Sequence, residues 1–104
     1  MWLLGRLTLI VLLAVKVHYV FLSWSASADA GPGLTYSVYR AVSAQPCPAA
    51  GDPSYQLLVR GLYYRATNYF DKTVTSGNSY CYEIYSMLNG VMSAPAGPVG
   101  VTEP

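Results

Sequence analysis

Few side chains in this sequence are capable of acid–base, nucleophilic or metal chemistry, and they are widely spaced. The 104 residues contain one histidine, His18, and two cysteines, Cys47 and Cys81. A hydrolytic triad needs a histidine beside an acid and a nucleophile, and a structural zinc site needs about four ligands. Neither set has a candidate here. We therefore predict no catalytic, cofactor-binding or metal-binding residue and no enzyme activity, and we interpret His18 as a strand histidine without a function.

The acidic residues add no catalytic pattern. Asp29, Asp52, Asp71, Glu83 and Glu103 are scattered along the chain, without the pairing that carboxylate catalysis requires. No glycine-rich phosphate-binding loop is present. The formal net charge of +1 provides no strong field to attract a nucleic acid, so we expect no nucleic-acid partner.

The two cysteines allow two interpretations. Cys47 and Cys81 form one disulfide if the chain is exported, because an even cysteine count is typical of oxidising compartments. Such a crosslink contributes about 3–4 kcal/mol in the chain-entropy picture. The alternative is a pair of free thiols. We favour the disulfide.

Composition and length indicate one folded β domain. Hydrophobic residues make up 53% of the chain and charged residues 11%, which excludes a disordered tail. A chain of this length holds a single domain and equals the usual size of a β-sandwich, about 100 residues. Ten tyrosines favour strands, where one ring face packs while the hydroxyl stays in water.

Residues 1–16 allow three interpretations. A weakly positive start, an apolar run and a small-residue site at Ala26-Ser-Ala28 suggest a cleaved signal peptide. A membrane anchor needs about 20 apolar residues, and Lys16 and His18 interrupt this run. Residues 17–24 read as a strand that cleavage would remove, so we favour residues 8–15 as the first strand. The domain itself is expected over residues 17–104.

Alternating apolar residues predict the remaining strands. They are expected at residues 17–24, 34–41, 55–59, 65–70, 80–86 and 91–101, with a hairpin turn at Asn89-Gly90. Pro95 and Pro98 place the last strand at a sheet edge. About seven short strands and no helical period predict an all-β fold, an immunoglobulin-like sandwich of two antiparallel sheets.

Four segments carry a resemblance to a known family. Val20-Phe-Leu-Ser-Trp24 and Leu34-Thr-Tyr-Ser-Val-Tyr-Arg40 are similar to the second and third strands of fibronectin type III domains. Val74, Gly77 and Tyr80 have the family's spacing before its sixth strand, and Met92-Ser-Ala-Pro95 resembles the start of its last strand. The resemblance covers about residues 17–104 and is greatest to versions in bacterial exported proteins.

The strand pattern and the resemblance together predict the core. The expected core residues are Trp24, Tyr36, Val38, Tyr69, Val74, Tyr80, Tyr82 and Ile84. Tyr80 is expected to return its hydroxyl to the backbone, as in the tyrosine corner of such sandwiches. The resemblance also places the loop with Cys47 beside the strand with Cys81, on the outer face of the sheet, where a disulfide needs Cα atoms within about 7 Å.

The resemblance implies a non-catalytic structural or binding module of an exported or cell-surface protein. It would be part of a multidomain chain, and would space other domains or dock a protein or polysaccharide. The alternative is a small membrane-anchored protein with a helix over residues 7–24. Tyr39, Tyr63, Tyr64 and Tyr85 are candidates for exposed binding aromatics, although we favour cross-strand packing as their role.

Overall fold

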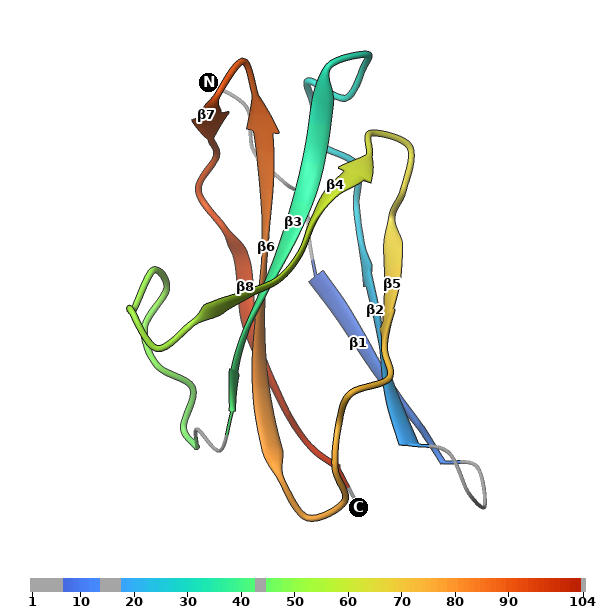
Figure 1. Ribbon diagram of the computed structural model, residues 1–104, viewed down its shortest axis with the longest axis vertical. Helices are drawn as coiled ribbons and strands as arrows, with labels where there is room; N and C mark the ends of the chain where they lie inside the picture. Colours follow the sequence, from blue (N-terminus) through green and yellow to red (C-terminus); the bar gives the residue numbers. More distant parts are fainter. Residues whose placement is uncertain (1–6, 14–17, 43–44, 104) are drawn as a thin grey trace.

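The computed structural model describes residues 7–13, 18–42 and 45–103, and within them all regular structure is β-strand (Figure 1). A three-stranded sheet has the order β1 (Leu7–Leu13), β2 (His18–Trp24), β5 (Asn68–Asp71). A five-stranded sheet contains β4 (Gln56–Tyr63), β3 (Leu34–Val42) and β6 (Ser79–Leu88) in that order, followed by β7 (Val91–Met92) and β8 (Ala96–Thr102), which both pair with β6. All pairings are antiparallel. The predicted all-β sandwich is confirmed.

The alternation of residue types places one face of each strand in a shared core. In β2, Val20, Leu22 and Trp24 are buried, whereas Tyr19 and Phe21 lie half-buried on the other face. A period of two positions along a strand produces this division. The core between the sheets contains Val20, Leu22, Trp24, Leu34, Tyr36, Val38, Val74, Tyr80, Tyr82, Ile84 and Ala96.

Most of the residues predicted for the core lie in it. Trp24 and Tyr36 belong to opposite sheets and their ring centroids are 5.6 Å apart. Tyr69 is different, because it is only partly buried and packs against the core from its side. It lies on β5, a short strand at the sheet edge that is paired with β2 alone.

Two predicted strand limits are wrong. The strand expected at residues 55–59 runs from Gln56 to Tyr63, because Gly61 takes a φ of 75° and forms an irregularity in β4. The strand expected at residues 65–70 begins only at Asn68 and ends at Asp71. Its first part is a turn in which the amide of Ala66 donates to the carbonyl of Tyr63 at 2.7 Å.

The strand expected at residues 91–101 consists of two pieces. β7 and β8 are separated around Pro95. Both pair with β6 at the edge of the sheet, which is the position predicted from the two prolines. Counted as one interrupted strand, they make the seven strands expected from the sequence. The predicted turn at Asn89-Gly90 is present, with φ values of 51° and 76°.

The amino-terminal segment forms strands where it is described. Leu7–Leu13 pairs with His18–Trp24 in register, from Leu7 opposite Trp24 to Leu13 opposite His18. The alternative of a bilayer helix over residues 7–24 is therefore wrong for these residues, whose β-branched and aromatic side chains suit a hairpin. No helix in the described part of the chain is long and apolar enough to cross a membrane. Cleavage of a signal peptide and the domain boundary near residue 16 stay predictions.

Candidate functional site

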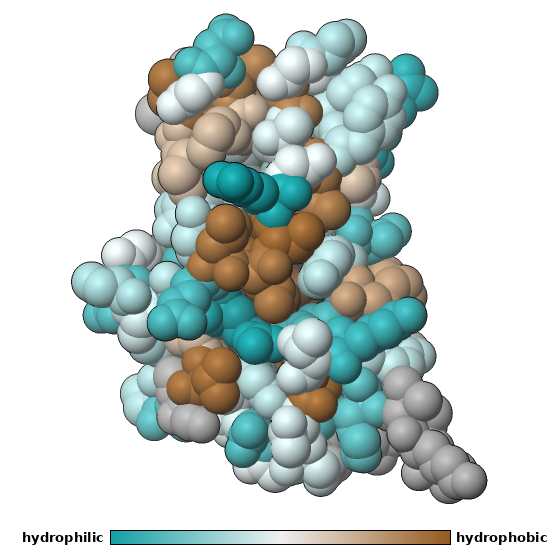
Figure 2. All heavy atoms as spheres, in the orientation of Figure 1, coloured by the Kyte–Doolittle hydropathy of each residue, from teal (hydrophilic) through white to brown (hydrophobic). Residues whose placement is uncertain are grey.

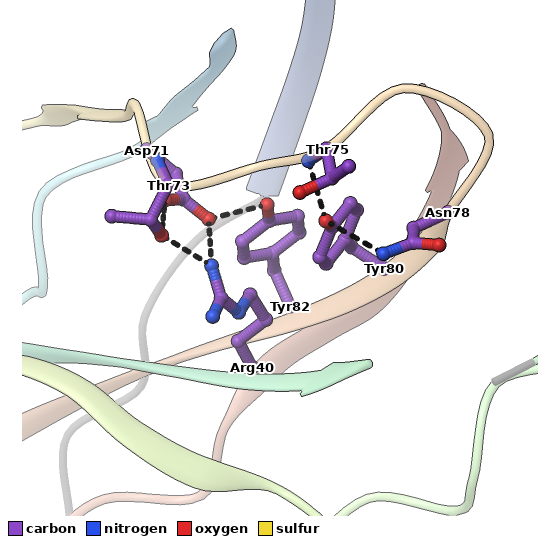
Figure 3. A network of polar contacts seen from close by, with 7 residues as sticks. All are labelled: Arg40, Asp71, Thr73, Thr75, Asn78, Tyr80 and Tyr82. Carbon is purple, nitrogen blue, oxygen red and sulfur yellow. Dashed lines mark hydrogen bonds and ion pairs between the residues drawn. The ribbon is translucent and has the colours of Figure 1, made fainter. Parts of the chain in front are cut away.

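A polar cluster centred on Asp71 connects the two sheets (Figure 3). Asp71 ends β5 and is 1% exposed. Thr73 donates to its Oδ1 from the backbone amide at 3.0 Å and from the hydroxyl at 2.6 Å. Arg40 from β3 and Tyr82 from β6 each donate to Oδ2 at 2.7 Å. The four acceptor positions of the carboxylate are thereby filled.

The electrostatics of this cluster favour a charged Asp71. Burial alone would raise the pKa of the Asp71 carboxyl, but hydrogen bonds from Thr73, Tyr82 and Arg40 outweigh it and hold the pKa below its usual value. Burial and the hydrogen bond to Asp71 raise the pKa of Tyr82, which stays a proton donor. Because every acceptor of Asp71 is occupied by the protein, the cluster joins the sheets and offers no carboxylate to a ligand.

The predicted tyrosine corner lies beside this cluster (Figure 3). Tyr80 is buried, and its hydroxyl accepts the backbone amide of Thr75 at 2.7 Å. The Arg40 guanidinium lies 5.2 Å from the centroid of its ring, in cation–π contact. Tyr80 therefore fixes the turn that leads from β5 to β6.

The predicted disulfide between Cys47 and Cys81 is present, with Cα atoms 5.7 Å apart. Cys81 faces outward from β6, as expected, yet it is fully buried because the loop that carries Cys47 covers it. Two further contacts hold this loop: the Gly51 amide donates to Glu83 at 3.1 Å, and the Tyr55 hydroxyl donates to the Pro48 carbonyl at 2.8 Å. The outer face of β6 is thus closed by a tethered loop.

Glu83 under this loop is a buried acid that the sequence analysis missed. It is 0% exposed and accepts hydrogen bonds from Gly51 and from the hydroxyl of Tyr85. Burial raises the pKa of Glu83, and the two hydrogen bonds only partly oppose it. Burial and the carboxylate of Glu83 raise the pKa of Tyr85 to about 12.

The four tyrosines singled out in the sequence divide into two pairs. Tyr39 and Tyr85 are half-buried and pack edge to face, with ring centroids 5.1 Å apart, so packing accounts for them. Tyr63 is 61% exposed and lies at the end of β4, with its centroid 4.5 Å from that of Tyr64. The Nε of Arg65 donates to the Tyr64 hydroxyl at 3.1 Å.

Three of the five acidic side chains are buried, which the sequence does not reveal. Asp71, Glu83 and Glu103 are buried, and Glu103 Oε1 lies 3.0 Å from His18 Nδ1. The exposed charges among the described residues are Asp29, Asp52, Arg60, Arg65 and Lys72. Arg60 lies in β4, Arg65 in the turn that follows it and Lys72 directly after β5. Figure 2 shows an apolar patch over β4 bordered by hydrophilic residues.

Other possible ligand sites are small or absent from the described residues. A hollow of about 60 Å³ lies between β3 and β4, lined by Arg40, Val42, Gln56, Leu57 and Leu58. Pockets that hold drug-sized ligands usually measure roughly 300–1,000 Å³, so this hollow is small beside them. No three histidine, cysteine or acidic side chains of the described part gather as metal ligands would.

Comparison with solved structures identifies the fold. An Fn3-like protein from Clostridium thermocellum superposes with a TM-score of 0.66 at 23% identity, over 98% of this chain and 93% of the other. The fold is that of a fibronectin type III domain. A fourth FNIII domain of human origin superposes on the fibronectin type III sandwich described here with a TM-score of 0.64 at 17% identity, over 97% of this chain and 77% of its own length. No protein-family model and no curated protein matches the sequence.

The same fibronectin type III sandwich is similar to part of a longer enzyme. Pectate lyase PelI from Erwinia chrysanthemi, solved in complex with tetragalacturonic acid, gives a TM-score of 0.65 at 17% identity. The match covers 93% of this chain and only 28% of the lyase. Domains with this fold therefore occur both as nearly whole chains and as modules of multidomain proteins.

Proposed function

We propose that the chain is a non-catalytic module of an exported or cell-surface protein, which spaces neighbouring domains or docks a protein or polysaccharide. The observation that carries this proposal is the Cys47–Cys81 disulfide on a fibronectin type III sandwich. Disulfides persist in oxidising compartments and are rare in the reducing cytosol. The Asp71 cluster and the tethered loop use their polar groups internally, as a structural module requires.

The shape and the comparisons support the modular part of the proposal. The molecule is elongated, with principal extents of 39 × 26 × 18 Å, and β8 ends near one end of its long axis (Figure 1). An elongated body of this kind suits a spacer. The pectate lyase contains a similar domain as about a quarter of its chain and was solved with an acidic oligosaccharide, so polysaccharides belong among the ligands to test.

The first experiment measures the intact mass of the full chain secreted by an exporting host, after thiol alkylation with and without a reductant. We expect no alkylation of the unreduced protein and two alkyl groups after reduction. The same mass shows whether the strand containing Trp24 is retained, because a mass beginning near Asp29 means a cleaved signal peptide. Free thiols in the secreted protein, or retention of the chain in the cytosol, would overturn the exported-module proposal.

A further inference from the structure

The turn between β4 and β5 presents tyrosines and cations to solvent. We call this region the β4–β5 turn surface and define it by Arg60, Tyr63, Tyr64, Arg65 and Asn68. Arg60, Tyr63, Arg65 and Asn68 are exposed, and Tyr64 is half-buried. Arg60 is three positions before Tyr63, so the two lie within about 11 Å along the chain.

This surface is held in one arrangement by contacts of its own. The amide of Ala66 donates to the Tyr63 carbonyl at 2.7 Å and closes the turn. The Arg65 guanidinium carbon lies 5.4 Å from the centroid of the Tyr64 ring, and its Nε donates to the hydroxyl of that residue. These two contacts orient the guanidinium of an exposed residue through its Nε and its π face, and neither uses an Nη group. A preoriented guanidinium fork loses less freedom when it binds a carboxylate.

The charges around the surface favour an anionic ligand. Within the described residues Arg65 makes no ion pair, and Asp71, which follows on β5, is buried and neutralised by Arg40. Of the two exposed acids, Asp52 lies in the loop before β4, where its carboxylate accepts hydrogen bonds from Ser54. The other, Asp29, lies in the loop between β2 and β3, which begins beside the turn, where the Trp24 amide donates to the Thr67 carbonyl at 2.9 Å. With Arg60 in β4 and Arg65 in the turn, the exposed cations here still outnumber this one acid.

The kind of apolar contact on the turn distinguishes a sugar from a protein partner. Tyr63 is the large exposed apolar side chain of the turn itself, Leu62 and Ala66 are half-buried, and the next exposed ring along β5 is that of Phe70, which packs against Tyr19 and Phe21. The exposed aliphatic Leu57 is six positions away in β4, about 20 Å along a strand. A protein interface would bring aliphatic anchors together, whereas the apolar face of a pyranose needs one exposed aromatic ring beside polar donors.

We propose that the β4–β5 turn surface binds an acidic polysaccharide, with a uronate carboxylate on the Arg65 guanidinium and a sugar face on the Tyr63 ring. Bidentate hydrogen bonds from the Nη groups recognise the carboxylate, and Arg60 and Asn68 contact neighbouring sugars. This inference rests on the docking role proposed above and specifies its ligand class. A neutral glycan leaves both cations without partners and binds more weakly.

The test is affinity electrophoresis of the full chain in native gels that contain polygalacturonate, with dextran gels as the neutral comparison. We expect retardation by polygalacturonate alone. Arg65→Gln and Tyr63→Ala should each weaken binding by about tenfold, the size of one lost charge-assisted or stacking contact. Lys72→Gln is the matched control, since it removes the same charge from an exposed position outside the surface and should change binding by less than about threefold.

Three results would overturn the proposal. They are the absence of retardation at low salt, an equal effect of Lys72→Gln and Arg65→Gln, and competition by poly-L-glutamate as effective as that by oligogalacturonate. The second result indicates a diffuse charge effect, and the third a site that reads acidic chains of any kind. Thermal unfolding midpoints of all variants verify that the fold is retained. A negative result here would not count against the exported-module proposal, because the mass experiment tests that proposal separately.

Discussion

A β-carbon added at Gly100 would lie 2.8 Å from the Sγ of Cys47. Gly100 belongs to β8 and pairs with Cys81 in β6, so the disulfide passes directly over its Cα. The added carbon would also lie 3.6 Å from the Sγ of Cys81. The missing side chain of Gly100 thus makes room for the crosslink.

We expect Gly100→Ala to lower the free energy of unfolding of the oxidised protein by about 1–3 kcal/mol, the usual cost of overpacking. The same substitution should cost much less in the Cys47→Ala/Cys81→Ala background, where the opposing sulfur atoms are gone. Gly31→Ala is the control, because the nearest atom to its added carbon is 3.9 Å away. Denaturant titrations compare the wild type, the double alanine background and the three glycine variants, and an equal cost of Gly100→Ala in both backgrounds would contradict this explanation.

Removal of the disulfide should loosen the whole tethered loop. The 34-position separation of Cys47 and Cys81 gives an expected loss of about 3–4 kcal/mol for the double alanine variant. The Gly51 amide, which donates to Glu83, should then exchange its hydrogen faster than the amides of β3. Hydrogen exchange followed by mass spectrometry measures this rate. An unchanged exchange rate of the Gly51 amide would show that the contacts of Glu83 and Tyr55 hold the loop without the disulfide.

Asp71 should make the protein more stable at neutral pH than in acid. Its pKa is lowered in the folded state, so the stability it adds is present above the pKa of the unfolded chain, near 4, and is lost as the pH falls through the folded value. Asp71→Asn leaves Arg40 partly buried without its anion, and we expect a loss of about 3 kcal/mol at pH 7. The loss should shrink below pH 4. Asp29→Asn, at an exposed position, should show no such pH dependence.

Glu83 should have the opposite pH dependence. Its pKa is raised, so its contribution is fully present below the unfolded value and is lost as the pH rises through the folded value. Glu83→Gln stays neutral throughout and should gain stability relative to the wild type between pH 4 and pH 7. Denaturant midpoints across this range are the measurement, and a difference that moves in favour of the wild type with rising pH would contradict the buried, destabilised anion.

The parts of the fold that depend on local spacing were predictable. Val20, Leu22 and Trp24 alternate at the strand period, and the Val74–Gly77–Tyr80 spacing led to the tyrosine corner found at Thr75. The disulfide also followed, because the resemblance placed the loop with Cys47 beside the strand with Cys81. In each case the information lies within a few residues or in a known strand order.

Other features depend on contacts between distant residues. Glu83 is buried only because Gly51, 32 positions away, lies over it, and His18 meets Glu103 across 85 positions. Nothing near these residues in the sequence reports such neighbours. The strand expected at residues 55–59 stops before Gly61 because glycine usually interrupts strands, but at positive φ this glycine lets β4 continue after an irregularity. The same limit hid the burial of Asp71, Glu83 and Glu103, which leaves two exposed acids among the described residues.

Both edges of the five-stranded sheet are irregular, which affects how the sheet can contact a second molecule. On one side, register shifts interrupt β4 opposite Tyr36, Val38 and Tyr39, and on the other Pro98 removes an amide from β8. Flat, regular edges recruit strands from other molecules, and bulges and prolines prevent this. Two copies of this domain that meet along these two edges can therefore touch without extending the five-stranded sheet from one molecule into the next.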